Sequence, residues 1–384
     1  KGIGKAVKGT KQLLKYAIYH SNLFEDLGFK YLGPIDGHNL DELTEALMVA
    51  KMMQRPCLVH IYTKKGKGYA PAEDNSGEYH GLPPKKDDDN NCKGECFTDA
   101  FGKALLSFAD KDNSIYAVTA AMKYGTGLQH FYKAFPERFF DVGIAEQHAV
   151  TFSAGLASQG KLPVFAVYSS FLQRSYDQLI HDCAIEKRHI VLGIDRAGFV
   201  GEDGETHHGL FDVAMLTTVP GVTVYSPSDT AELSQCLEQA LYKDKGIVAV
   251  RYPRGCELYR SGTKAYSDFR HVSNKSRKLI FTYGRISAYA YTIHGVDVLQ
   301  AIKIFPIADE MIDICLAYDE IYAFEEGERE GGIAQKLCTA LALAGFKGRF
   351  TITAVDGFVR HADVAAQLHN AMLDADGMRK ITGE

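Results

Sequence analysis

The sequence predicts an α/β protein in which parallel sheets are flanked by helices. Between Phe97 and Arg254, segments with helical periodicity alternate with short apolar runs rich in β-branched residues, and this alternation is typical of a parallel sheet covered on both faces. With 384 residues the chain is too long for one ordinary core, and its 46% of hydrophobic residues can fill several. We therefore expect two or three domains.

The first block predicts one helix and one strand. Apolar residues recur every three or four positions over 39–54, which indicates a helix, and the short apolar run over 57–62 indicates a buried strand. The loop K-K-G-K-G-Y (64–69) follows and opens a polar stretch that continues to about residue 95. We interpret this stretch as a linker, so that the first domain and its linker occupy residues 1–90.

Two further blocks each predict a sheet of their own. The middle domain, 91–256, has five apolar runs, at 115–119, 164–168, 190–194, 222–225 and 247–250. A polar stretch over 255–277 then leads into a smaller α/β domain, 257–384. Its predicted strands cover 278–283, 296–305, 320–325 and 350–354. Between Gly284 and Val296 there is room for only a short helix.

Charge and cysteine usage exclude several kinds of partner. The 43 Lys and Arg nearly balance the 48 Asp and Glu, and a net charge of −5 gives no electrostatic attraction to nucleic acid or to an anionic membrane. No apolar run reaches the ~18–20 residues that span a bilayer, and no signal peptide is recognisable, so we expect a cytoplasmic protein. The eight cysteines suit reduced thiols. We interpret the close pair Cys92 and Cys96 as linker cysteines and assign no metal to them.

Polar side chains gather just after three predicted strands of the middle domain. They belong to the motifs Y-S-S-F-L-Q-R (168–174), D-R-A-G-F-V-G-E-D-G-E-T-H-H-G (195–209) and R-Y-P-R-G (251–255). Sites of α/β sheets lie at the carboxyl ends of the strands. Arg196 and Arg254 have the planar fork that binds phosphate, although either could be a surface arginine. The set predicts a site for a phosphorylated substrate that exchanges protons.

Two other residues stand in suggestive surroundings. Glu146 lies between apolar neighbours in D-V-G-I-A-E-Q-H-A-V (141–150), where a carboxylate is poorly solvated. It is either a functional acid or a helix-entry carboxylate satisfied by backbone amides. Lys65 lies in a glycine-rich loop that resembles an anion-binding loop. The sequence has no G-x-x-x-x-G-K-[ST] motif, however, so a nucleotide hydrolase is disfavoured.

Six motifs together resemble one enzyme family. They are the three strand-end motifs, G-F-K-Y-L-G-P-I-D-G-H-N (28–39), T-K-K-G-K-G-Y-A-P-A-E (63–73) and P-E-R-F-F-D-V-G-I-A-E-Q-H-A-V (136–150). With them the chain resembles the 1-deoxy-D-xylulose-5-phosphate synthase family of transketolase-like thiamine-diphosphate enzymes, closely up to residue 255 and more weakly beyond it. The resemblance implies a transketolase-like, thiamine-diphosphate-binding fold followed by a transketolase C-terminal-like domain.

The same resemblance implies an activity. It is the decarboxylative condensation of pyruvate with D-glyceraldehyde 3-phosphate to 1-deoxy-D-xylulose 5-phosphate and CO₂, which feeds isoprenoid, thiamine and pyridoxal biosynthesis. Glu146 corresponds to the glutamate that hydrogen-bonds N1′ of the cofactor's aminopyrimidine, and Phe171 to the aromatic residue stacked on that ring. Ile144 and Lys65 fall at further cofactor-binding positions.

Other residues fall at catalytic and substrate-binding positions of the family. His207, and His80 from the first block, correspond to histidines that shuttle protons, and Asp203 to a residue that orients this site. The positions that hold the triose phosphate are matched by Tyr168, Arg196 and Arg254. The family also implies a homodimer, and a bacterial cytosol is the expected location.

One family element is absent from this sequence. The family's G-D-G…N element binds the metal that holds the cofactor's diphosphate, and we therefore expect the Mg²⁺ ligands in a missing N-terminal part, with thiamine diphosphate bound weakly by this chain alone. Two alternatives stay open. The chain could be another transketolase-like subunit, such as the β-type subunit of a 2-oxoacid dehydrogenase or half of a split transketolase. It could also be a non-catalytic fragment that dimerises.

Overall fold

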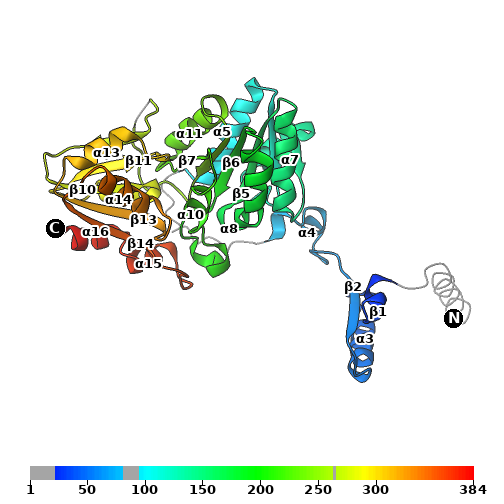
Figure 1. Cartoon of the computed structure of the whole chain (residues 1–384). Coiled ribbons are helices and arrows are strands. Elements are labelled where there is room, and N and C mark those ends of the chain that lie inside the picture. The colour runs from blue at the N-terminus through cyan, green and yellow to red at the C-terminus, as the bar shows by residue number, and fades with distance from the viewer. Residues whose placement is uncertain (1–21, 81–94, 263–264) are drawn as a thin grey trace, which may run out of the picture. The chain divides into compact units, whose positions relative to one another are not determined.

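The computed structural model describes residues 22–80, 95–262 and 265–384, and the chain forms two compact units, Lys1–Asp87 and Asp88–Glu384 (Figure 1). Each unit is described by itself. Most of the predicted linker beyond residue 80, including Cys92, lies outside the described residues.

The first unit is a small parallel β-α-β arrangement. In chain order it contains α2 (Leu23–Asp26), β1 (Lys30–Asp36), α3 (Leu40–Met52), β2 (Cys57–Tyr62), α4 (Ala70–Asp74) and η1 (Glu78–His80). The side chain of Asn39 caps α3 by accepting a hydrogen bond from the amide of Glu42 at 3.3 Å. The predicted helix and strand are present, but α4 and η1 lie in the stretch interpreted as a linker.

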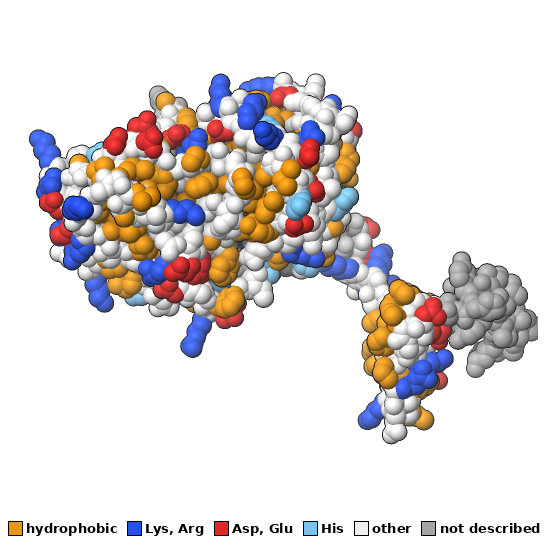
Figure 2. All heavy atoms as spheres, viewed as in Figure 1, with side chains coloured by type: hydrophobic (Ala, Val, Ile, Leu, Met, Phe, Trp, Pro, Cys, Tyr) orange, Lys and Arg blue, Asp and Glu red, His pale blue; other side chains and the backbone are white. Residues whose placement is uncertain are grey.

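The expectation of a buried strand in this unit was wrong. β2 is half-buried over its first three residues and exposed over the last three. β2 pairs only with β1 in a two-stranded sheet, and α3 packs against both strands. Apolar side chains are also exposed on this unit (Figure 2). On α3 they include Leu40, 73% exposed, and Met52, 80% exposed.

The second unit contains a seven-stranded sheet. Its strand order is β12-β7-β8-β6-β5-β3-β4, and only the pairing of β12 with β7 is antiparallel. The strands are β3 (Ile115–Thr119), β4 (Phe139–Asp141), β5 (Leu162–Tyr168), β6 (Ile190–Asp195), β7 (Thr223–Tyr225), β8 (Ile247–Arg251) and β12 (Lys303–Phe305). All five predicted strands of the middle block are present, and β4 and β12 extend the two edges.

Alternating side chains of these strands pack on opposite faces. Val164 and Ala166 of β5 join the core formed with α5 (Phe97–Lys111) and α11 (Thr230–Tyr242). Phe165 and Val167 join the core formed with α7 (Glu146–Ser158) and α10 (Asp212–Leu216). Burying an apolar side chain of this size contributes about 1.5–3 kcal/mol, so both faces are strongly held.

Short helical segments connect these elements. They are α6 (Gln129–Ala134), η2 (Pro136–Arg138), α8 (Ser169–Leu172), η3 (Gln173–Ser175), α9 (Tyr176–Gln178), the π-helix η4 (Leu179–Ala184), η5 (Gly201–Asp203) and η6 (Glu205–His207).

A five-stranded sheet follows, with strand order β14-β13-β10-β11-β9. Its strands are β9 (Phe269–Val272), β10 (Lys278–Tyr283), β11 (Asp297–Ala301), β13 (Glu320–Glu328) and β14 (Arg349–Val355). The helical segments of this region are η7 (Gly284–Ile286), α12 (Ser287–Ala290), α13 (Asp309–Leu316), α14 (Ile333–Leu343), α15 (Val364–Asn370) and α16 (Ala375–Thr382). The predicted short helix after Gly284 is thus present.

Two predictions for this region were wrong. The expected strand over 296–305 is two strands, since β11 stays in the five-stranded sheet while β12 crosses to pair with β7. β9 lies in the stretch read as polar, because its sequence F-R-H-V carries no apolar alternation. β9 and β12 are edge strands. An edge strand is less buried than a central one, so its sequence needs fewer regularly spaced apolar residues.

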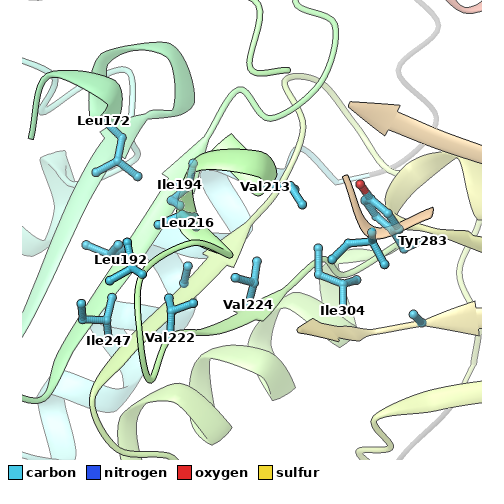
Figure 3. Packing of buried hydrophobic residues seen from close by; sticks show 14 of the residues in the cluster. Leu172, Leu192, Ile194, Val213, Leu216, Val222, Val224, Ile247, Tyr283 and Ile304 are labelled. Carbon is cyan, nitrogen blue, oxygen red and sulfur yellow. The ribbon is translucent and has the colours of Figure 1, made fainter. Parts of the chain in front are cut away.

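The two sheets of this unit share one hydrophobic core. The cluster in Figure 3 continues from Leu172 and Leu192 through Val213 and Val224 to Tyr283 of β10. The middle and third blocks are therefore packed directly on each other, and the third block can act on loops of the middle one.

Cys96 is part of this folded unit, so the interpretation of Cys96 as a linker cysteine was wrong. It is the N-cap residue of α5 and lies opposite Cys256 in an isolated antiparallel bridge, with the two sulfur atoms 2.6 Å apart.

Within the described ranges, no helix is both long and apolar enough to cross a membrane.

Candidate active site

The predicted substrate residues lie at the carboxyl ends of three adjacent strands of the seven-stranded sheet. Tyr168 ends β5, Arg196 follows β6 directly, and Arg254 follows β8 by three residues. β6 lies between β5 and β8, and Tyr168 is in register with Asp195. The parallel pairing therefore brings together residues that are up to 86 positions apart in the sequence.

Arg196 is held in a fixed and unusual position. Its φ of 62° is in the left-handed region, which non-glycine residues rarely adopt. The guanidinium carbon lies 3.8 Å from the centre of the Tyr168 ring, and Nη1 donates to the carbonyl of Gly125 at 2.7 Å and to Asp195 Oδ1 at 3.0 Å. Its Nε is buried with no hydrogen bond to a described group.

Asp195 holds Arg196 in place through this hydrogen bond. It is fully buried and accepts a hydrogen bond from Thr98 Oγ1 at 2.7 Å. Burial raises the pKa of its carboxyl to about 6, while the charge of Arg196 acts in the opposite direction. Burial also raises the pKa of the Tyr168 hydroxyl.

Asp203 joins the two predicted phosphate-binding arginines. Its Oδ1 lies 2.9 Å from Arg254 Nη1, and its Oδ2 lies 3.7 Å from Arg196 Nε. The sequence resemblance assigned Asp203 to the orientation of the histidine site. In the structure Asp203 forms ion pairs with Arg196 and Arg254, so it belongs with the predicted phosphate-binding residues rather than with the histidine.

Phe171 and His207 form the aromatic part of the site. The Phe171 ring stacks on Tyr168 at 5.6 Å between centroids, and His207 meets Phe171 edge-on at 5.2 Å. The hydroxyl of Thr206 lies 2.9 Å from His207 Nδ1. The side chains of 168, 171, 196, 203, 207 and 254 thus form one continuous set of contacts.

Glu146 begins α7 and is 2% exposed. Its Oε2 lies 2.9 Å from Arg174 Nη1, but the two groups are not aligned as a hydrogen bond, and that oxygen has no hydrogen bond to a described group. A helix N-terminus favours a carboxylate there. Arg174 lies in η3, directly after the helix α8 that carries Phe171, and η3 contacts α7. Ile144, beside Glu146 in the sequence, is 77% exposed.

Lys65 and His80 belong to the first unit and are described within it alone. Lys65 Nζ is hydrogen-bonded to His80 Nδ1. The neighbouring Lys64 pairs with Glu73 at 2.5 Å, and the amide of Gly68 donates to the same carboxylate at 2.8 Å. The glycine-rich loop is therefore folded around Glu73.

Several residues of this site were missed from the sequence. Arg174 and Asp195 stand inside the quoted motifs, and that position next to predicted site residues was the signal that could have found them. The hydroxyls of Ser169 and Ser170 are buried without hydrogen bonds to described groups, next to Phe171. Among the described residues no cluster of three or more His, Cys, Asp or Glu could hold a metal ion.

Comparison with known proteins gives two family matches in chain order. Residues 1–63 match the family described as 1-deoxy-D-xylulose-5-phosphate synthase, and residues 96–257 match the transketolase pyrimidine-binding domain. The chain is 47% identical over 301 residues to a protein of Clostridium kluyveri named 1-deoxy-D-xylulose-5-phosphate synthase, covering 76% of this chain and 47% of that protein. A protein of the same name from Caldanaerobacter subterraneus is 39% identical, with 98% of this chain and 63% of the relative covered.

Solved structures resemble the chain in fold. A structure titled as a split-gene transketolase, an inactive β4 tetramer, matches with a TM-score of 0.65 and 23% identity, covering 74% of this chain and 96% of its own. A transketolase from Campylobacter jejuni matches with a TM-score of 0.63 and 15% identity, covering 96% of this chain and 70% of its own. These similarities confirm the predicted transketolase-like α/β fold.

The relatives are longer than this chain, which spans 47% and 63% of the two described above. Curated proteins that carry the same name match most of this chain at 38–47% identity. Motif order, fold and sequence identity agree: over most of its length the chain is similar to proteins named 1-deoxy-D-xylulose-5-phosphate synthase, and its fold is transketolase-like.

Proposed function

We propose that this chain carries the pyrimidine-binding and triose-phosphate-binding part of an enzyme that condenses pyruvate with D-glyceraldehyde 3-phosphate to 1-deoxy-D-xylulose 5-phosphate and CO₂. The observation that carries the proposal is the convergence of Arg196 and Arg254 on one carboxylate, Asp203, at the ends of adjacent strands. Two fixed guanidinium groups suit a phosphate, and the buried, unbonded Nε of Arg196 is a donor that such a ligand can use.

The described residues also fit an aminopyrimidine. The buried Oε2 of Glu146 lacks a hydrogen bond and can receive one from a ring nitrogen that carries a proton. Phe171 offers a ring face for stacking, Ile144 offers an exposed apolar side chain, and Lys65 is the cation proposed for the cofactor from the first unit. Thiamine diphosphate, when bound, supplies the carbon nucleophile that attacks the pyruvate carbonyl.

Proton transfer is the proposed role of the histidines. His207 borders Phe171, and the contact of its Nδ1 with Thr206 orients the ring so that Nε2 is the nitrogen offered to the substrate. His80 is proposed as a second proton carrier, with Lys65 beside it. Tyr168 holds the Arg196 guanidinium in place through its ring face.

We propose further that Mg²⁺ accompanies the cofactor, that the active assembly is a homodimer, and that the enzyme works in the bacterial cytoplasm in isoprenoid and thiamine biosynthesis. These parts of the proposal rest on the family. The fold neighbour titled as a β4 tetramer shows only that a related chain assembles with copies of itself.

The test is a product assay on this chain and on the intact protein that contains it. Each is incubated with thiamine diphosphate, Mg²⁺, [1-¹³C]pyruvate and D-glyceraldehyde 3-phosphate, and ¹³CO₂ and a pentulose phosphate are measured by mass spectrometry. Formation of both by the intact protein supports the proposal. Acyl transfer to lipoamide without triose phosphate would support a 2-oxoacid dehydrogenase subunit instead. Dimers of the intact protein that release no CO₂ would support the non-catalytic alternative.

A further inference from the structure

A buried ion pair of the third block touches the loops that carry the proposed phosphate site. Arg285 and Glu326 are 6% and 5% exposed, and Arg285 Nε donates to Glu326 Oε2 at 2.9 Å. Arg285 lies in η7 at the end of β10, and Glu326 lies in β13. Neither residue belongs to a motif that the sequence linked to substrate binding.

The pair hydrogen-bonds both backbone groups of one residue of the middle block, Phe199. The amide of Phe199 donates to Glu326 Oε1 at 2.7 Å, and Arg285 Nη2 donates to the Phe199 carbonyl at 2.9 Å. Gly198 allows this approach, because a Cβ atom there would lie 2.3 Å from Glu326 Oε1. The backbone that leads from Arg196 to Asp203 is thus fixed by side chains of the third block.

Arg285 contacts Arg254 directly at its backbone, and it holds the residue next to the one that the Arg254 side chain contacts. Arg285 Nη1 donates to the backbone carbonyl of Arg254 at 3.3 Å. At the other end, Arg254 Nη1 donates to the carbonyl of Val200, the residue after Phe199, at 3.0 Å. Arg285 thus fixes the backbone of Arg254 and also the backbone at Phe199, next to the Val200 carbonyl that the Arg254 guanidinium contacts. The direction of the Arg254 guanidinium therefore depends on Arg285.

We propose that Arg285, with Glu326, is a positioning residue of the triose-phosphate site, so that the third block determines affinity for the phosphorylated substrate without touching it. This inference rests on the proposed function. A guanidinium displaced by about 1 Å can cost up to roughly 100-fold in a well-oriented site, so loosening the pair should weaken phosphate binding. Pyruvate carries no phosphate, and its binding should change little.

The chain offers a matched control in a second buried pair between the same two blocks. Arg270 of β9 pairs with Glu232 of α11 at 2.6 Å, and their side chains are 16% and 1% exposed. The contacts of Glu232 are with Ser228 and Gln300, and do not involve the segment from Arg196 to Asp203. Arg270→Lys therefore weakens the packing of the blocks without loosening the proposed phosphate site.

The experiment measures binding of sn-glycerol 3-phosphate, an unreactive analogue, by titration calorimetry on the intact protein, with Tm recorded for each variant. Arg285→Lys and Glu326→Gln should each weaken binding about tenfold, as expected for a modest displacement, while Arg270→Lys stays within about twofold at a similar loss of Tm. In steady-state kinetics Arg285→Lys and Glu326→Gln should raise KM for the triose phosphate and leave KM for pyruvate within about twofold.

The outcomes separate this inference from the proposed function. If Arg254→Ala leaves glycerol phosphate affinity unchanged, the phosphate assignment falls, and the role of Arg285 falls with it. If Arg254→Ala weakens binding while the Arg285 and Glu326 variants match Arg270→Lys, only the positioning role is lost.

A measurement on unaltered protein covers variants that fail to fold. Coupling is reciprocal, so ligand binding at Arg254 must strengthen the contacts of Arg285. Glycerol phosphate should then slow amide hydrogen exchange over 283–287, and unchanged exchange there at saturation would overturn the proposal.

Discussion

Arg254 Nη1 lies 2.9 Å from Asp203 Oδ1, and the other oxygen of this carboxylate lies 3.7 Å from Arg196 Nε. One carboxylate therefore partly neutralises two arginines. In the proposed function an arriving phosphate competes with Asp203 for the same donors, and this competition predicts how the site should respond to substitution.

Asp203→Asn should strengthen binding of inorganic phosphate to this chain. The side chain of Asp203 is 30% exposed, and partly exposed ion pairs of this kind contribute about 0.2–1 kcal/mol, so affinity should rise by up to about fivefold. Calorimetric titration at low ionic strength measures the change. The exposed Glu202→Gln, at 81%, is the control and should have a smaller effect. Weaker phosphate binding by Asp203→Asn would mean that the carboxylate supports the site rather than competing for it.

Arg254→Ala should raise KM for the triose phosphate far more than KM for pyruvate in the intact enzyme. Hydrogen bonds to charged groups contribute about 1.5–3 kcal/mol, which corresponds to roughly a 10- to 150-fold increase. Steady-state kinetics with each substrate varied in turn provides the measurement. Equal effects on both constants would show that this arginine does not select the phosphate.

Glu146→Ala should nearly abolish turnover in the intact enzyme while leaving Tm close to that of the unaltered protein. The carboxylate is buried at the start of α7, where its Oε2 has no hydrogen bond and lies 2.9 Å from the half-exposed Arg174, so its loss removes the proposed partner of the cofactor and one ion pair within the chain. Glu137→Ala, at an exposed side chain, serves as the control. Activity within a few-fold of the unaltered enzyme would remove Glu146 from the mechanism.

Asp195→Asn should remove a specific pH dependence of stability. Burial raises the folded-state pKa of Asp195 from 3.8 to about 6, so the folded chain binds more protons than the unfolded chain between these values. The stability of the unaltered protein should therefore fall relative to Asp195→Asn as pH rises through this window, by about 3 kcal/mol in total. Urea unfolding of both proteins from pH 4 to 7 measures the difference. A constant difference across the window would contradict the raised pKa.

Gly198→Ala should destabilise the second unit more than Gly221→Ala. Both glycines have positive φ, 79° and 74°, so both substitutions carry the cost of a left-handed alanine, about 1–2 kcal/mol. Only at Gly198 would the new Cβ also meet a neighbour, Glu326 Oε1 at 2.3 Å, whereas nothing lies within 4 Å at Gly221. We expect an additional loss of about 1–3 kcal/mol at Gly198, measured by denaturant unfolding. Equal losses would show that Glu326 yields without cost.

The local pattern was a reliable guide where strands are buried on both faces. β3 and β10 begin and end at the residues predicted for them, because an uninterrupted apolar run is the local signature of such a strand. The edge strand β9 was not recognised, since F-R-H-V carries little pattern, and the edge strand β12 was not separated from β11 within the predicted strand 296–305. Which sheet an edge strand joins depends on a partner distant in the sequence.

The sequence by itself determined the α/β class, the central strands and, through its motifs, the family resemblance and the residues proposed for the site. Only the tertiary structure decided that Asp203 pairs with two arginines, that Arg174 faces Glu146, and that Arg285 reaches back to Arg254. The reason is physical. Secondary structure follows from the spacing of apolar residues along the chain, whereas ion pairs between strand ends depend on sheet order and on a core shared by two blocks, neither of which is encoded in any short segment.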